Sequence, residues 1–118
     1  EIYVVNDKLG TPTYTHDFSE NVKLLIEKGK NGLFNMVCGD LTDRFEVATE
    51  LIRLLGLKDD IEIIKVNSDY FSKEYFAERP ECERLINKKL DDLNLNIMRP
   101  WKVALKEYID NYYFGYIS

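Results

Sequence analysis

DRFEVATELIRLLGLKDDIEIIKV, residues 43–66, is the stretch that decides the fold class of this chain. Asp43 and Glu46 have the spacing of a capping box, which predicts the start of a helix. Gly56 predicts its end, and the β-branched residues of 61–66 predict a strand directly after it. Apolar residues recur in the helix at helical spacing: Phe45, Ala48, Leu51, Ile52 and Leu55. A helix followed at once by a strand is typical of α/β domains.

The sequence before this stretch predicts two further strands and another helix. Residues 2–5 and 33–37 are short runs of β-branched, aromatic and other apolar residues, as in strands. Between them, Asp17 and Glu20 form a second capping box, and Gly29 is placed to end the helix that follows. The apolar side of this helix is expected to carry Phe18, Val22, Leu25 and Ile26.

The sequence after it predicts an irregular aromatic segment or a short helix at 68–77, and residues 84–86 could add a brief strand. Helices are expected at 87–93 and from Pro100 onward, because proline is favoured in the first turn of a helix. One face of the last helix carries Trp101, Ala104, Leu105, Tyr108 and Ile109. We therefore expect residues 1–118 to form a single mixed α/β domain with about three short strands and four helices.

Composition and charge argue against several classes of protein. The chain is 45% hydrophobic and 31% charged, as in globular proteins, with no apolar run near the roughly 18 residues that span a bilayer. With no leader-like start, a cytoplasmic location is expected. A net charge of -5 with scattered basic residues disfavours nucleic acid. Cys38, Cys82 and the single His16 lack zinc-site spacing, so we expect free thiols and no metal.

The chain also lacks the motifs of a complete cofactor-dependent enzyme. No GxGxxG loop follows a strand, so neither NADPH nor NADH is expected to bind this chain alone. Tyr70 and Lys73 are three residues apart, whereas a catalytic Tyr–Lys pair on a helix needs four. No catalytic residue is expected in this chain. It starts with a strand and without Met, which suggests a fragment of a larger protein.

Four short patterns occur in a fixed order and together span nearly the whole chain. They are DKLGTPT at 7–13, GLFN at 32–35 with DRFEVA at 43–48, AERP at 77–80 with RL at 84–85 and KL at 89–90, and PWKVALKEY at 100–108. They resemble the patterns of the dTDP-4-dehydrorhamnose reductases, an RmlD-like family of extended short-chain dehydrogenases/reductases. Lys8 replaces the family's Gln, and Asp43 and Glu83 replace Ser.

The resemblance implies the C-terminal, nucleotide-sugar-binding part of a Rossmann-like NAD(P)H-dependent reductase. Such a parent reduces the C4 ketone of dTDP-4-dehydrorhamnose with NADPH or NADH, in dTDP-rhamnose and polysaccharide biosynthesis. The catalytic Tyr and Lys and the cofactor-binding half would lie upstream. Arg79 and Pro80 match the R-P motif whose Arg contacts the nucleotide, and Gly10, Pro12 and Thr13 belong to a loop that would approach the substrate.

Each of these residues also has a structural interpretation. Arg79 could pair with Glu78 or Glu81 on the surface, and the segment 10–13 could be a plain turn. Arg99 also precedes a proline but resembles only a helix start. Asp17, Asp43 and Glu46 could be helix caps or ligands, and Trp101 could be part of the core or a platform for the sugar. The aromatic set Tyr70, Phe71, Tyr75 and Phe76 could pack inside the fold or form a wall that stacks on thymine.

Three alternatives stay open. The parent could be another reductase or epimerase of nucleotide-sugars, or a non-catalytic NADP-binding subunit resembling the regulatory subunit of methionine adenosyltransferase. An intact Thr/Ser and Tyr-x-x-x-Lys set upstream would favour a reductase. The chain could also be an independent small binding domain, against which its abrupt strand start argues. Homo-oligomers could form through apolar surface exposed near residues 2–5 and 18–26.

Overall fold

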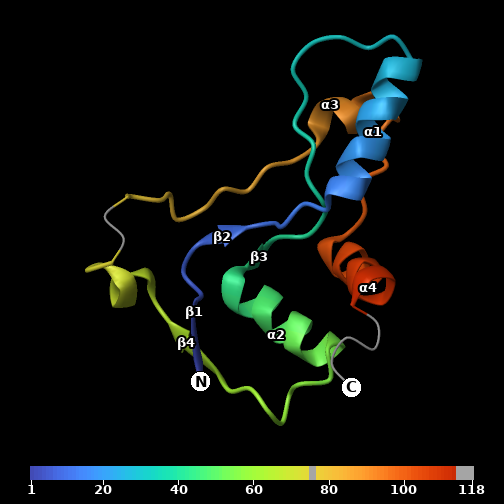
Figure 1. The fold of residues 1–118 in the computed structure, drawn as a ribbon. Helices are drawn as coiled ribbons and strands as arrows, with labels where there is room; N and C mark the ends of the chain where they lie inside the picture. Colours follow the sequence, from blue (N-terminus) through green and yellow to red (C-terminus); the bar gives the residue numbers. More distant parts are fainter. Residues whose placement is uncertain (75–76, 114–118) are drawn as a thin grey trace.

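A computed structural model describes residues 1–74 and 77–113. Its central unit is a pair of parallel strands, β1 (Ile2–Val5) and β4 (Ile63–Val66), in register from Ile2 opposite Ile63 to Val5 opposite Val66. Parallel strands need a crossover connection, and the helix α2 (Arg44–Leu54) lies in it and packs against both strands (Figure 1). The strands predicted at 2–5 and 61–66 are confirmed, the second starting two residues later.

The predicted start and end of α2 are also confirmed. The Asp43 carboxylate accepts a hydrogen bond from the backbone N–H of Glu46 at 2.9 Å, and Gly56 adopts a positive φ of 71° just beyond the helix. The second hydrogen bond of a capping box, from the Asp43 backbone N–H to the Glu46 side chain, is not formed. The Glu46 carboxylate instead accepts the Thr42 hydroxyl at 2.5 Å, so it stabilises the strand before the helix.

Two very short strands, absent from the sequence prediction, lie above this unit. β2 (Leu9–Gly10) pairs antiparallel with β3 (Thr42–Asp43), Leu9 opposite Asp43 and Gly10 opposite Thr42. Residues 9–10 were expected to be part of a turn-rich loop. The described part of the chain therefore has four strands rather than about three.

The helix α1 (Thr15–Glu27) differs from its prediction at its start and in its buried side. It begins two residues before Asp17, and Tyr14 precedes it without a side-chain cap. Its buried residues, spaced one turn apart, are Asp17, Asn21 and Leu25, whereas Phe18 and Ile26 are 44% and 72% exposed. The polar side of the helix is buried because distant groups satisfy it: the Asn21 side chain bonds the backbone of Leu95 and Ile97. The predicted end at Gly29 is confirmed by its φ of 64°.

The strand predicted at 33–37 is not present. No neighbouring strand lies beside this segment in the described chain, and side chains satisfy part of its backbone. The Asn87 amide bonds both the N–H and the C=O of Val37, at 2.9 and 2.7 Å, and the Lys89 ammonium donates to the Leu33 carbonyl at 3.0 Å. Residues 84–86 are not a strand either.

The remaining helices agree with the sequence prediction. They are η1, a single 3-10 turn at Ser68–Phe71, α3 (Lys88–Asp92) and α4 (Trp101–Tyr112), which starts directly after Pro100. The predicted face of α4 buries Trp101, Ala104 and Ile109, while Tyr108 is 37% exposed. Four α-helices in the described chain confirm the mixed α/β class. Tyr75 and Phe76 lie outside the described residues.

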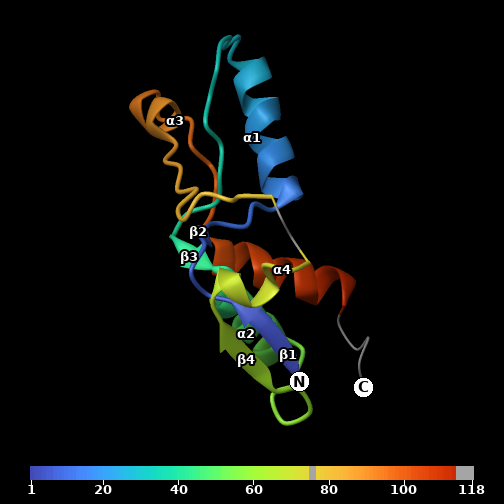
Figure 2. The ribbon, with the colours of Figure 1, turned by 90° about the vertical axis from the view of Figure 1, so that its left-hand side faces the viewer.

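The core consists of two small clusters that share Met98. One contains Leu25, Met36 and Leu90, and the other contains Cys38, Trp101 and Ala104. The structure measures 49 × 38 × 19 Å, and its radius of gyration is 16.8 Å, against about 13.5 Å expected for a compact domain of this length. Figure 2 shows this thin, elongated outline.

Such a shape leaves apolar residues on the surface. Ile2 and Tyr3 of β1 are exposed, as are Phe18 and Ile26 of α1. Self-association through this surface stays a prediction. In the part of the chain that the structure describes, no helix is long and apolar enough to cross a membrane.

Candidate functional site

Backbone hydrogen bonds bring two of the four sequence patterns side by side. The Leu9 N–H donates to the Glu81 carbonyl at 2.8 Å, and the Glu83 N–H donates to the Leu9 carbonyl at 2.9 Å. These bonds place residues 81–83 parallel to β2, on the edge that β3 does not occupy. The Gly10 loop and the segment that follows Arg79–Pro80 are therefore neighbours, although about 70 residues separate them in the sequence.

An open groove with a volume of about 580 Å³ lies where the two segments meet. One side is formed by Gly10 and Thr11, and Val37 also contributes. The other side is formed by the four residues 82–85, Cys82, Glu83, Arg84 and Leu85. We take this groove as the candidate ligand site, because pockets that combine a few polar groups with apolar walls are typical of ligand sites.

Gly10 lines the groove without needing glycine's backbone freedom. Its backbone is outside the left-handed region, and a Cβ added there would lie 3.9 Å from the Glu83 Cβ, an ordinary contact. The fold itself therefore does not require glycine at position 10. That the missing side chain lets a ligand approach the backbone in the groove stays a proposal.

Gly10→Ala is expected to leave stability unchanged or raise it by up to about 1 kcal/mol, because alanine restricts the unfolded chain. As a control, Gly29→Ala has open space but a φ of 64°, so it should destabilise by about 1 kcal/mol. Denaturant unfolding of both variants measures the difference. If Gly10→Ala lowered the free energy of unfolding as much as Gly29→Ala does, the expectation that position 10 tolerates a side chain would be contradicted.

Pro12 and Thr13 continue the loop but do not line the groove. The Thr13 hydroxyl oxygen accepts a hydrogen bond from the Cys38 N–H at 3.4 Å, and the Tyr14 N–H donates to the Cys38 sulfur at 3.5 Å. The Thr11 hydroxyl donates to the Asp40 carbonyl at 2.6 Å. These bonds hold the loop against residues 38–40, so Thr13 positions the neighbouring groove residues. Pro12 is exposed.

Arg79 and Pro80 are exposed and lie just before the groove wall. The Lys8 ammonium donates to the Arg79 carbonyl at 3.2 Å and fastens this segment to the loop. Among the described residues, neither Glu78 nor Glu81 pairs with the Arg79 guanidinium. The guanidinium is therefore available for a ligand.

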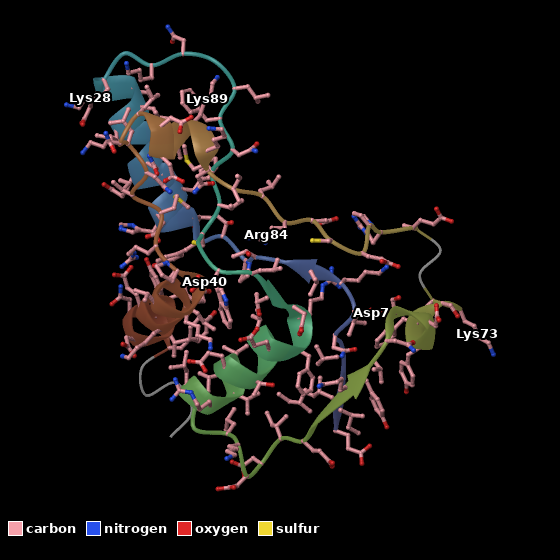
Figure 3. The ribbon with its side chains drawn as sticks, turned by 180° about the vertical axis from the view of Figure 1, so that it is seen from behind. Asp7, Lys28, Asp40, Lys73, Arg84 and Lys89 are labelled. Atoms are coloured by element: carbon pink, nitrogen blue, oxygen red, sulfur yellow. The ribbon has the colours of Figure 1, made fainter. Side chains whose placement is uncertain are left out.

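Arg84 and Cys82 line the groove and were not predicted as site residues. In this segment the resemblance assigned a ligand role only to Arg79 and Pro80, so no local signal marked Cys82 or Arg84. Only the pairing of residues 81–83 with β2 turns this segment into a groove wall. The family loop also starts with Asp7, whose carboxylate accepts bonds from the Ser68 backbone N–H at 3.0 Å and hydroxyl at 2.9 Å (labelled in Figure 3). Asp7 thus stabilises η1.

A cluster of charges that joins α1 to α4 was also missed. The Arg99 guanidinium donates to both Asp17 carboxylate oxygens, with its shortest contact at 2.6 Å, and to Glu107 at 2.7 and 3.0 Å. The hydrogen bonds that Arg99 donates to Glu107 and Asp17 raise the pKa of Arg99, and Arg99 lowers the pKa of Glu107. Asp17 is only 4% exposed. The prediction that Asp17 caps a helix is therefore wrong, because Asp17 lies inside α1. Arg99 does precede the start of α4, as expected, but its side chain also binds Asp17 and Glu107.

Arg99 is also connected to the loop through the backbone. The Gly39 N–H donates to the Arg99 carbonyl at 3.0 Å, and the Trp101 N–H donates to the Gly39 carbonyl at 3.1 Å. Gly39 precedes Asp40, whose carbonyl accepts the Thr11 hydroxyl. Hydrogen bonds, together with the backbone of Arg99 and of residues 39–40, therefore connect the buried Asp17 to Thr11 in the groove.

Neither cysteine forms a disulfide, as predicted. Cys38 is buried and Cys82 is exposed; burial raises the pKa of the Cys38 thiol. The described residues contain no group of three or more His, Cys, Asp or Glu side chains placed to hold a metal ion.

A second hollow of about 370 Å³ lies between the start of α1 and the end of α4. Tyr108 packs edge-on against Tyr14 with ring centroids 5.9 Å apart, and Tyr112 lies 5.4 Å from Tyr108. Trp101, at the other end of α4, is buried in the core, as expected. The choice between packing and base stacking for the aromatic segment 68–77 stays open; Tyr70 stacks on Tyr3 with ring centroids 5.0 Å apart.

Comparison with known families identifies the class of protein. The sequence model of the RmlD substrate binding domain matches residues 1–114, and the chain belongs to this family. It is 28% identical over 109 residues to the spore coat polysaccharide biosynthesis protein SpsK of Bacillus subtilis (strain 168), covering 92% of this chain and 36% of that protein.

Solved structures give the same answer in more detail. A dTDP-4-dehydrorhamnose reductase from Clostridium acetobutylicum is 34% identical, with a TM-score of 0.86, over 93% of this chain and 38% of that one. Two further reductases of the same name share the fold. The Yersinia enterocolitica protein is 26% identical, with a TM-score of 0.81, over 94% of this chain and 38% of that one. The Bacillus anthracis protein, in complex with NADP, is 24% identical, with a TM-score of 0.82, over 93% of this chain and 38% of that one. The chain thus spans less than two-fifths of the length of these relatives.

Proposed function

We propose that this chain is the substrate-binding part of an NAD(P)H-dependent nucleotide-sugar reductase that acts on dTDP-4-dehydrorhamnose. Family membership and the likeness to the Clostridium acetobutylicum reductase support this proposal. The observation that carries it is the groove between Gly10 and residues 82–85, with unpaired guanidinium groups in its wall and just before it. Family and groove together favour a ligand that carries phosphates.

In this proposal the chain binds and orients the nucleotide-sugar. A guanidinium offers a planar pair of donors that matches two phosphate oxygens, so Arg79 would bind the diphosphate. Pro80 would restrict the backbone beside it. Gly10 and Thr11 would contact the ligand from the opposite wall, and Pro12 and Thr13 would hold that loop in place. Fixing the substrate in this way aligns its ketone for reduction.

The described residues do not fit the nicotinamide cofactor. Its pyrophosphate would need a glycine-rich turn at the start of a helix, but Tyr14 precedes α1 and the Asp43 side chain already caps α2. The reductant, NADPH or NADH, would supply hydride to the ketone from another part of a longer polypeptide. We place the catalytic Tyr and Lys there as well, with this chain as the C-terminal part.

One further observation supports the cofactor assignment, and another supports a cytoplasmic location. The Bacillus anthracis protein, which shares the fold, was crystallised with NADP. Free thiols suit a reducing compartment such as the cytoplasm.

A reductase assay on the complete polypeptide tests the proposal. With dTDP-4-dehydro-L-rhamnose, we expect NADPH or NADH to be oxidised and dTDP-L-rhamnose to form, followed by absorbance and chromatography. The 118-residue chain alone should show neither turnover nor cofactor binding. A polypeptide that binds the sugar nucleotide but never reduces it would instead support a non-catalytic binding subunit, and a preference for a different nucleotide-sugar would support another reductase or epimerase.

A further inference from the structure

Arg84 is the cationic side chain that lines the groove, and it stands next to an anionic one. Glu83 and Arg84 both belong to the wall that faces Gly10 and Thr11. Both side chains are exposed, and no hydrogen bond or ion pair is formed by either side chain with the described residues. Arg79 lies five residues earlier and does not line the groove. Arg84 is therefore a second guanidinium, in addition to Arg79, that a group bound inside the groove could contact.

The backbone holds this wall firmly enough for a defined contact. Leu9 bonds to Glu81 and Glu83 on either side of Cys82, directly before Arg84. The Lys8 ammonium also donates a hydrogen bond to the Arg79 carbonyl, in the segment just before this wall.

We propose that Arg84 binds the diphosphate of the ligand within the groove and that Glu83 opposes this binding by charge repulsion. The proposal deepens the function proposed above and rests on it. A guanidinium binds phosphate oxygens through charge-assisted hydrogen bonds, whereas a carboxylate a few ångströms away repels the same oxygens. The two neighbours thus set the affinity of the groove for a nucleoside diphosphate in opposite directions.

The test uses variants that each remove one charge and keep the side-chain size similar. Arg84→Gln and Glu83→Gln are compared with Lys28→Gln, whose lysine lies at the far end of α1 (Figure 3). Binding of dTDP to the complete polypeptide is measured by calorimetry at low and high salt. Arg84→Gln should weaken binding about tenfold, Glu83→Gln should strengthen it about two- to threefold, and Lys28→Gln should change nothing.

Salt and a conservative variant separate charge from shape. Salt screens exposed charges, so the difference in dTDP affinity between the wild type and Arg84→Gln should be smaller at high salt. Arg84→Lys should recover only part of the affinity, because an ammonium lacks the paired donors. Thermal unfolding of each variant checks that the fold is intact.

Several results would overturn the proposal. One is wild-type affinity in Arg84→Gln; another is equal weakening by Arg84→Gln and Glu83→Gln, which would show that shape rather than charge matters. If dTDP binding depends on Arg79 but not on Arg84, this inference fails while the proposed function stands. If the wild-type polypeptide binds neither dTDP nor dTDP-4-dehydro-L-rhamnose, the proposed function itself fails.

Discussion

Arg99→Ala is expected to lower the free energy of unfolding by about 3 kcal/mol. Removing Arg99 leaves the Asp17 carboxylate, 4% exposed, without its cationic partner in a low-dielectric environment. Breaking a buried ion pair by deleting one member typically destabilises by about 3–5 kcal/mol. We take the lower end because the Arg99 side chain is itself 33% exposed. Denaturant unfolding of the variant and the wild type measures this difference.

Matched variants show whether the buried charge is the cause. Glu107→Gln removes the other partner, but Glu107 is 35% exposed, so it should cost less than about 1 kcal/mol. Asp17→Leu combined with Arg99→Met removes both charges and should be more stable than Arg99→Ala alone. A loss below about 1 kcal/mol in Arg99→Ala would mean that Asp17 is solvated and that the cluster contributes little.

Arg79→Ala should weaken binding of the nucleotide-sugar by the complete polypeptide tenfold to a hundredfold, or about 1.5–3 kcal/mol. The reason is the loss of charge-assisted hydrogen bonds to phosphate. Arg79→Lys should restore only part of the affinity, because the paired donor geometry is lost. Cofactor affinity should be unchanged in both variants. Calorimetric titration with substrate and with NADPH measures each quantity.

The control for this experiment has to be an arginine away from both the groove and the buried cluster. Arg53, in the last turn of α2, pairs with Glu50 at 2.6 Å, so Arg53→Ala should change substrate affinity by less than about threefold. Arg99 is unsuitable, since its replacement is expected to destabilise the fold. Wild-type binding by Arg79→Ala would remove the R-P motif from the site and leave the groove at Gly10 and Arg84 as the candidate.

Local patterns predicted the elements whose stabilising contacts are also local. The Asp43 cap joins residues three apart, and Gly29 and Gly56 end their helices through their own backbone conformation. The capping pattern at Asp17 and Glu20 is equally good as sequence, yet Asp17 lies inside α1 and binds Arg99. A pattern of this kind cannot reveal a partner 82 residues away.

The same distinction applies to the candidate site. The motifs identified the family and the two segments, with Arg79 and Gly10 as their most informative residues. Arg84 was not identified, because it lines the groove only through the pairing of Leu9 with Glu81 and Glu83. Pro12 and Thr13 were assigned to the site on motif membership, but they do not line the groove.

The sequence by itself determined the α/β class, the strands β1 and β4, the helix α2, and the resemblance to a reductase family. These depend on capping, periodicity and short motifs, which act over a few residues. Tertiary structure alone decided that the polar side of α1 is buried, that residues 33–37 are not a strand, and that Arg84 faces Gly10. Burying Asp17 or Asn21 is favourable only when distant partners satisfy their hydrogen bonds, and those partners meet only in the folded chain.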